Sequence, residues 1–426
     1  MVTAMIGLSV MIMTAAPCSV GSTAHADRSL RADVRYLADD HLAGRYTGSP
    51  GGALAAGYLR GRFLKVGARP GLPGWLQTYP IAPDLPAFRA VDRSLVPSQG
   101  TNVVALIPGS DPLLRQEAVV VGAHYDHLGR GVSQSMSLGT VGEIHNGADD
   151  NASGAATLIE IARRLVRCPA KRSVVVVAFS GEELGLLGST AYVKEPVVPM
   201  AQTVAMVNLD MVGRLRNSKL LAFGSETATE FPALLDSLNR SAQFDLHYSG
   251  DGFGRSDQQS FYLAGKPVLH LFTDLHEDYH RPSDDWEKIN APGLARVAAF
   301  ATDLVRAIAD RTTPLTFVNK PPPPSSPVAG GSSSSGYGAY FGSIPDMSAG
   351  GVGVRLSGVR PDSPAAKAGL KEGDVLLGIG GLEISDLQAM TDALRSHQPG
   401  DTVLVRYRRG AIVDSASTVL GRRGGS

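Results

Sequence analysis

Three short runs in the middle of the chain are almost entirely apolar, and they limit the possible folds more than any other feature. They occupy residues 118–122, 173–179 and 204–209. A strand that is buried on both faces has this continuous pattern, whereas a half-exposed strand alternates between apolar and polar residues. Helical spacing is clearest between the first two runs, at 155–166. Strands alternating with helices predict an α/β fold, a three-layer sandwich around a mixed, mainly parallel central sheet.

Other segments of the first 310 residues fit the same architecture. Shorter runs typical of strands lie at 77–81, 102–107 and 267–272. Apolar residues at helical spacing predict two helices joined by a loop within 27–68, and a closing helix at 292–309.

Polar side chains follow each of the three apolar runs. His124 and Asp126 follow the first, Glu182 and Glu183 the second, and Asp210 the third. In open α/β sheets, ligands bind beyond the carboxyl ends of the strands. We therefore expect these side chains to lie together at one edge of the sheet.

One ten-residue stretch, HNGADDNASG at 145–154, crowds carboxylates, amides and small residues between a strand-like and a helix-like run. Such a segment is unsuited to a hydrophobic core or to an ordinary turn. It suits a carboxylate that must be held rigidly against positive charge. Asp150 is our candidate for that carboxylate. The strand-like run at 267–272 leads to two further candidates, Tyr279 and His280.

Together these segments supply the donor types of a zinc site. Two histidines and several carboxylates are ligands that Zn²⁺ accepts. The adjacent Glu182 and Glu183 repel each other unless metal neutralises one and the other carries a proton. If two ions are bound, one carboxylate must bridge them, and Asp150 suits this role. Asp126 lies two residues after His124, so on an extended segment it can accept the second ring N–H of that histidine.

Five motifs in this order resemble peptidase family M28, a family of dinuclear zinc aminopeptidases. They are HYD at 124–126, NGADDNASG at 146–154, GEELG at 181–185, NLDM at 208–211 and YHRP at 279–282. The resemblance spans roughly residues 28–310 and implies a zinc exopeptidase-like fold with two Zn²⁺ per chain. It implies two ligand sets that share Asp150, and these are His124, Asp150 and Asp210 for one ion and Asp150, Glu183 and His280 for the other.

The resemblance also implies an activity and catalytic residues. The chain would be a metal-dependent aminopeptidase that hydrolyses N-terminal residues from peptides by a zinc-activated bridging water. Glu182 would be the general base, Asp126 would orient His124, and Tyr279 would stabilise the oxyanion. Its substrates would be peptides with a free N-terminus, because in this family the α-amine docks beside the metals.

Composition changes sharply over residues 312–338, where four consecutive prolines are followed by glycines and serines. Such a stretch cannot build a core, so we expect a linker between a peptidase domain at 27–311 and a C-terminal unit at 339–422. The string PAAKAGLKEGD at 364–374 resembles the PDZ domains attached to secreted proteases. This implies a small β-rich domain that binds peptide C-termini. The carboxylate would lie on a glycine-containing loop formed by Tyr340, Phe341, Gly342, Ser343 and Ile344.

Residues 1–26 have the pattern of a signal peptide. An apolar run at 5–16 is too short to cross a bilayer comfortably and is followed by an A-x-A-like cleavage site that ends at Ala26. We therefore expect the protein to be exported, to the periplasm or the extracellular space. Lys+Arg and Asp+Glu balance at 40 each. Without a basic surplus, neither nucleic acid nor a membrane surface is an expected partner.

Two alternatives to the aminopeptidase stay open. The chain could be a peptide-binding adaptor in which the PDZ domain acts and the metal domain is a scaffold. It could also be a related metallohydrolase that acts on another amide, such as a carboxypeptidase or a glutaminyl cyclase-like enzyme. Glutaminyl cyclases share this fold with a single zinc, and the full set of two histidines and three carboxylates favours the dinuclear peptidase.

Overall fold

The computed structural model describes residues 23–85, 96–131, 135, 142–254, 256–320, 339–345, 353–385, 389–390, 393–394 and 396–421. Most of the predicted signal peptide, residues 1–22, lies outside these residues. The predicted cleavage point after Ala26 falls within the first turns of helix α1 (Thr23–Leu37), where the Ala26 side chain is buried. No helix in the described part of the chain is both long and apolar enough to cross a membrane.

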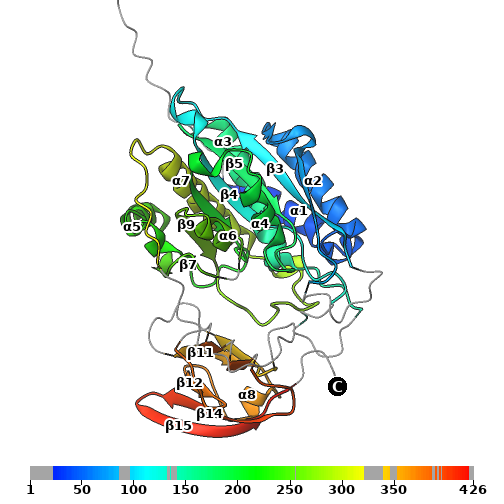
Figure 1. The fold of residues 1–426 in the computed structure, drawn as a ribbon, viewed down its shortest axis with the longest axis vertical. Coiled ribbons are helices and arrows are strands. Elements are labelled where there is room, and N and C mark those ends of the chain that lie inside the picture. The colour runs from blue at the N-terminus through cyan, green and yellow to red at the C-terminus, as the bar shows by residue number, and fades with distance from the viewer. Residues whose placement is uncertain are drawn as a thin grey trace, which may run out of the picture.

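The strands of the first domain form one nine-stranded sheet in the described residues (Figure 1). Its order is β1-β3-β5-β4-β6-β9-β7-β8, and β2 also pairs with β3. The four central strands β5, β4, β6 and β9 are mutually parallel, while β3 and β7 join them in antiparallel pairs. The predicted mixed, mainly parallel sheet is therefore confirmed. The strands are β1 Arg69–Pro70, β2 Leu76–Pro80, β3 Gln99–Ile107, β4 Ala118–His124, β5 Ser173–Phe179, β6 Thr203–Leu209, β7 Lys219–Phe223, β8 Asp245–Ser249 and β9 Val268–Phe272.

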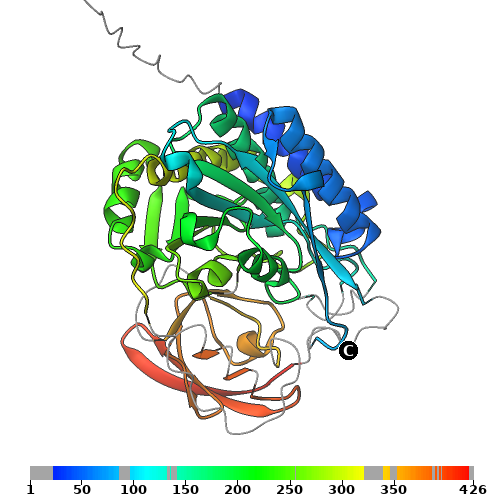
Figure 2. The same cartoon turned by 45° about the horizontal axis from the view of Figure 1, so that its top comes forward.

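Helices cover both faces of this sheet (Figure 2). Successive side chains of a strand point to opposite faces, so Val119 and Val121 pack into one core and Val120 into another. The first core contains α1, α2, α3, α5 and α7, and the second contains α4 and α6. This is the predicted three-layer sandwich. The helices after α1 are α2 Pro50–Val66, α3 Gly154–Arg167, α4 Leu187–Lys194, α5 Phe231–Ala242, α6 Gln258–Leu263 and α7 Ala291–Ala309.

The first part of the predicted linker contacts the first domain. Phe317 forms an isolated bridge with Ala228, and the backbone N–H of Lys320 donates a hydrogen bond of 2.8 Å to the Tyr262 hydroxyl. Residues 321–338, which hold the four prolines and the serines, lie outside the described part of the chain.

A separate antiparallel sheet with its own apolar core follows, as predicted for a small β-rich domain (Figure 1, orange to red). The string at 364–374 forms the short helix α8 (Pro364–Lys367) and the turn that leads into β12. The strands of this domain are β10 Ser343–Pro345, β11 Val354–Val359, β12 Val375–Ile379, β13 Leu382–Glu383, β14 Thr402–Arg409 and β15 Ile412–Val419.

Candidate metal centre

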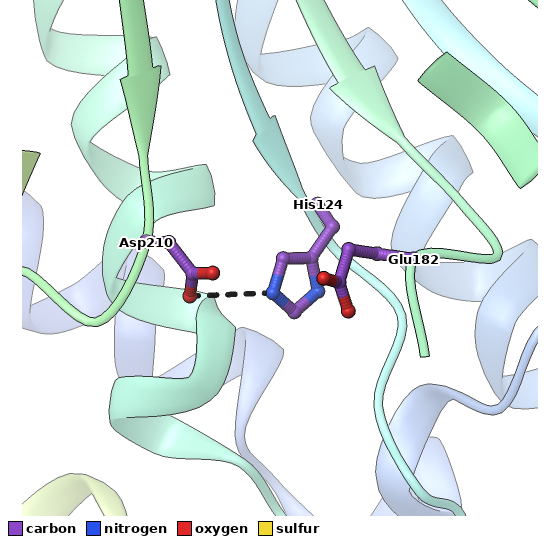
Figure 3. Close-up of side chains that lie close together, drawn as sticks. All are labelled: His124, Glu182 and Asp210. Carbon is purple, nitrogen blue, oxygen red and sulfur yellow. Dashed lines mark hydrogen bonds and ion pairs between the residues drawn. The ribbon is translucent and has the colours of Figure 1, made fainter. Parts of the chain in front are cut away.

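The carboxyl ends of β4, β5 and β6 bring three candidate side chains together. His124 is the last residue of β4, Glu182 lies just after β5, and Asp210 directly follows β6. Because these strands are parallel neighbours, their ends meet at one edge of the sheet. Figure 3 shows the imidazole of His124 between the carboxylates of Asp210 and Glu182, with Asp210 Oδ1 3.3 Å from His124 Nε2.

Asp150 lies between two histidines and presents one carboxylate oxygen to each. It sits in the helical turn Ala148–Ser153 that precedes α3, and its peptide bond to Asn151 is cis. Oδ1 is 3.3 Å from Nε2 of His124, and Oδ2 is 3.1 Å from Nε2 of His280. These contacts divide the donors into two sets that share Asp150. We call them the first metal position (His124, Asp210 and Asp150 Oδ1) and the second metal position (His280, Glu183 and Asp150 Oδ2). Donor atoms of Glu182 also lie within 4.8 Å of those of His124 and Asp210, and a donor atom of His127 lies within 4.8 Å of those of Asp150 and Glu183.

The spacing of these donors fits zinc. Tetrahedral Zn²⁺ with bonds of about 2.0–2.2 Å to nitrogen and oxygen separates its ligand atoms by about 3.3–3.5 Å. At the first metal position, Asp150 Oδ1 and Asp210 Oδ1 are each 3.3 Å from His124 Nε2. At the second, His280 Nε2 is 3.1 Å from Asp150 Oδ2 and 3.4 Å from Glu183 Oε2. These distances are mostly longer than an ordinary N–H···O hydrogen bond, so the donors are spread as they would be around a cation.

The electrostatics of the centre also favour a cation. Burial acts to lower the pKa of His124 and His280, yet the facing carboxylates raise the pKa of both well above the usual value. A pocket that draws protons onto buried imidazoles attracts a divalent ion by the same field.

Glu182 and Glu183 are adjacent, but their pKa values move apart. Burial raises the pKa of Glu182 well above its usual range, and Glu183 and Asp210 add to the effect while His124 opposes it. Burial also acts to raise the pKa of Glu183, but His280 and hydrogen bonds from imidazoles lower it to about 2. Two neighbouring acids with divergent pKa values suit different roles, one as an anionic ligand and the other as a proton carrier.

Asp126 contacts His124 differently from our expectation. The Nδ1 atom of His124 is 3.2 Å from the backbone carbonyl oxygen of Asp126, whereas the nearest carboxylate oxygen is 3.8 Å away. The carboxylate instead accepts the backbone N–H of Glu182 (3.3 Å) and the hydroxyl of Thr47 (2.9 Å). Asp126 therefore links the segment that carries His124 to the turn that carries Glu182.

Tyr279 lies at the edge of the centre. Its ring stacks on that of His280, with centroids 3.9 Å apart, and packs against the cluster that contains Met211 and Phe272. The predicted role of Tyr279 in oxyanion stabilisation stays a prediction. His124, Asp150, Glu183 and His280 are buried, whereas Glu182, Asp210 and Tyr279 are half-buried. Access from solvent is therefore on the side of these last three residues.

Several residues that shape the centre gave no signal in the sequence. Arg45 is fully buried and donates hydrogen bonds to backbone carbonyls of Tyr125, Asn146 and Gly147. It thereby ties the segment after β4 to the segment before Asp150. Arg45 and Thr47 belong to a loop that is far from the motifs in the chain, so only the folded structure reveals their contribution.

Asp284 fixes the Asp150 loop from the other side. Its Oδ2 accepts hydrogen bonds from the backbone N–H groups of Asp149 (2.9 Å) and Asp150 (3.1 Å). Its backbone carbonyl oxygen accepts a hydrogen bond from the backbone N–H of Ala148 (2.9 Å). Burial raises the pKa of Asp284 to about 6, and the nearby Asp149 carboxylate adds to this.

Replacement of Asp284 by alanine is expected to destabilise the metal-free protein by about 1–3 kcal/mol, because it leaves two buried amides without an acceptor. Urea unfolding in the presence of a chelator measures this. Asp245→Ala, on the exposed edge strand β8, is the control and should change stability by less than about 0.5 kcal/mol. Equal stability of Asp284→Ala and the wild type contradicts the assignment.

The predicted peptide-binding loop of the second domain continues into the edge strand β10. The Tyr340 N–H donates to the Gly421 carbonyl (2.8 Å), Phe341 is buried, and Gly342 has a φ of +83° that favours glycine. Ser343 and Ile344 belong to β10, which ends the sheet order in the described residues and pairs only with β11 there.

Comparison with known proteins agrees with this geometry. Residues 102–305 match the family model of peptidase family M28, and residues 333–420 match that of the PDZ domain. A probable leucine aminopeptidase from Arthroderma otae is 29% identical over 222 residues, which cover 48% of this chain and 58% of the relative. The chain spans about half the length of the curated relatives that it matches.

Solved structures share the fold at low sequence identity. The aminopeptidase from Aneurinibacillus sp. strain AM-1 superposes with a TM-score of 0.53 at 17% identity, covering 70% of this chain and 97% of that one. A glutaminyl cyclase from Bacteroides thetaiotaomicron, bound to N-acetylhistamine, gives a TM-score of 0.52 at 18% identity and covers 66% and 97%. The chain therefore shares the fold of these structures, with a segment at 102–305 that matches peptidase family M28 and a segment at 333–420 that matches the PDZ domain.

Proposed function

We propose that this protein is a zinc-dependent aminopeptidase that holds two Zn²⁺ per chain and removes N-terminal residues from peptides. The main support for the proposal is that Asp150 contacts both donor sets. Its Oδ1 faces His124 and its Oδ2 faces His280. A carboxylate engaged in this way suits a bridge between two ions. The names of the relatives, which include aminopeptidases, support a peptide substrate.

The chain's own residues supply the proton transfers. Zinc ions, when bound, would polarise the scissile carbonyl and lower the pKa of the attacking water. Glu182 lies at the solvent-accessible side of the centre, and its backbone N–H is held by the Asp126 carboxylate. We infer that Glu182 accepts a proton from the attacking water and returns it to the leaving amine. Tyr279, stacked on His280, is our candidate for stabilising the oxyanion.

A comparison of three substrates tests this function. The protein should hydrolyse leucine p-nitroanilide, lose this activity with a chelator and regain it with zinc. N-acetyl-leucine p-nitroanilide should not be hydrolysed, because it lacks the free amine. Equal rates on the acetylated compound contradict an aminopeptidase. Cyclisation of a peptide with N-terminal glutamine, without release of leucine, would instead support the glutaminyl cyclase-like alternative.

We further propose that the PDZ domain binds peptide C-termini beside β10 and so holds substrates near the peptidase domain. Two N-acetylated peptides test this, one with a free C-terminus and one with an amidated C-terminus. Full-length protein should bind the first at least about tenfold more tightly, because the amide removes a charge-assisted hydrogen bond. Fluorescence anisotropy measures this binding. An excess of either peptide should leave leucine p-nitroanilide hydrolysis unchanged. Equal affinity for the two peptides contradicts carboxylate recognition.

A further inference from the structure

His127 is a third histidine at the metal centre, outside both predicted ligand sets. It lies three residues after His124 and is fully buried. Its ring packs against Gly147, where an added Cβ would lie 2.4 Å from Cγ and Cδ2 of the imidazole. On another side it meets the ring of His280 edge to face, with centroids 5.6 Å apart. The imidazole is therefore held in one place between the Asp150 loop and His280.

Distances distinguish His127 from the ligand histidines. Its Nδ1 is 2.8 Å from Oε1 of Glu183 and 3.9 Å from Oδ2 of Asp150. The first distance is that of an N–H···O hydrogen bond and is shorter than the separation of two atoms bound to one zinc ion. The other oxygen of Glu183, Oε2, faces His280 at 3.4 Å. Glu183 thus turns one oxygen toward His127 and the other toward the second metal position.

We propose that His127 is a positioning residue of the second metal position. It donates its Nδ1–H to Oε1 of Glu183 and so keeps Oε2 directed at the ion beside His280. Hydrogen bonds to a ligating carboxylate orient it, and their loss typically weakens metal binding by about 10–100-fold. Within the described residues, the Nδ1 atom of His127 lies near Glu183 Oε1 and Asp150 Oδ2, which are on the side of the second metal position, so we expect the effect to be selective for the second ion. The inference rests on the proposed two-zinc centre.

Two substitutions of similar shape test this role. His127→Asn keeps an amide donor close to the position of Nδ1, while His127→Leu has almost the same outline but no donor. Nε2 of His127 has no hydrogen-bond partner among the described residues, so asparagine loses no bond at that atom. We expect His127→Leu to weaken the second zinc by about 10–100-fold and His127→Asn by less than about threefold. Binding of the first zinc should not change in either variant.

Competition with a chromophoric chelator gives the two stepwise affinities, and the visible spectrum of the cobalt-loaded protein reports the coordination. Unfolding in excess chelator shows that the variants fold without metal. If His127→Leu does not fold, His127→Gln replaces it, because its amide lies nearer the position of Nε2. His247→Asn is the control, since His247 is exposed on the edge strand β8 and its Nε2 lies 3.0 Å from Oδ1 of Asp245 on the same strand. Its zinc affinities should equal those of the wild type.

The outcomes separate this inference from the proposed function. Wild-type protein that binds less than one zinc contradicts the metal centre itself. Wild-type protein that binds two ions, together with a His127→Leu variant that binds the second as tightly, overturns only the role of His127. A second-ion affinity as weak in His127→Asn as in His127→Leu overturns the hydrogen bond from Nδ1.

Discussion

Replacement of Glu182 by glutamine is expected to remove nearly all hydrolysis and to leave the zinc content unchanged. Glutamine keeps the shape of the side chain but cannot accept the proton of the attacking water. Loss of general acid–base catalysis should lower kcat by about 10²–10⁴-fold. KM should change little, because we assign Glu182 to proton transfer and not to either metal position. Steady-state kinetics on leucine p-nitroanilide, with zinc quantified in the same sample, measure both effects.

The matched control is Glu195→Gln, on the exposed end of α4. This variant should have the kcat of the wild type. Wild-type activity in Glu182→Gln contradicts the assignment of the general base. Loss of zinc from Glu182→Gln also contradicts it, because the residue would then be a ligand.

Replacement of Asp150 by asparagine is expected to reduce bound zinc from two ions to at most one per chain. The amide has one oxygen in place of two, so it cannot face His124 and His280 with an acceptor on both sides. It also removes the negative charge that both positions share. If the lost charge stabilisation is several kcal/mol, kcat/KM should fall by about 10³-fold or more.

The neighbouring Asp149 provides the control for this choice of residue. Its Oδ1 accepts the backbone N–H of Gly213 (2.6 Å), and its Oδ2 lies 3.1 Å from Nε2 of His276, so both oxygens face away from the two metal positions. Asp149→Asn should lower stability but keep two zinc ions. Retention of two ions by Asp150→Asn, together with their loss from Asp149→Asn, contradicts the position of the bridge.

The central part of the fold was predictable because its signals are local. Strands buried on both faces have continuous apolar sequence, and β4, β5 and β6 begin and end close to the predicted limits. The edge of the sheet is different. Strand β8 alternates between half-buried and exposed residues, and neither β7 nor β8 is among the predicted strands. Their place in the sheet depends on pairing with strands that are distant in the chain.

The same distinction applies to the site. The spacing at the strand ends and the family resemblance predicted residues that the structure places together, including Asp150 and His280. They did not predict the contacts of Arg45 or Asp284. Arg45 binds backbone carbonyls about a hundred residues away in the sequence, and Asp284 binds the Asp150 loop from the opposite side. An isolated arginine or aspartate has no local pattern that reveals such contacts. His127 lies close to His124 in the sequence, but its contact with Glu183 could not be predicted from the sequence.

The central claim is that Asp150 bridges two zinc ions, and metal quantification of the intact protein tests it most directly. The protein is stripped with a chelator, loaded with zinc, freed of excess metal and measured for zinc per chain together with its hydrolysis of leucine p-nitroanilide. We predict two zinc ions per chain and activity that returns as they bind. Less than one zinc ion per chain in a folded, carefully loaded sample would contradict the metal centre and favour a peptide-binding adaptor.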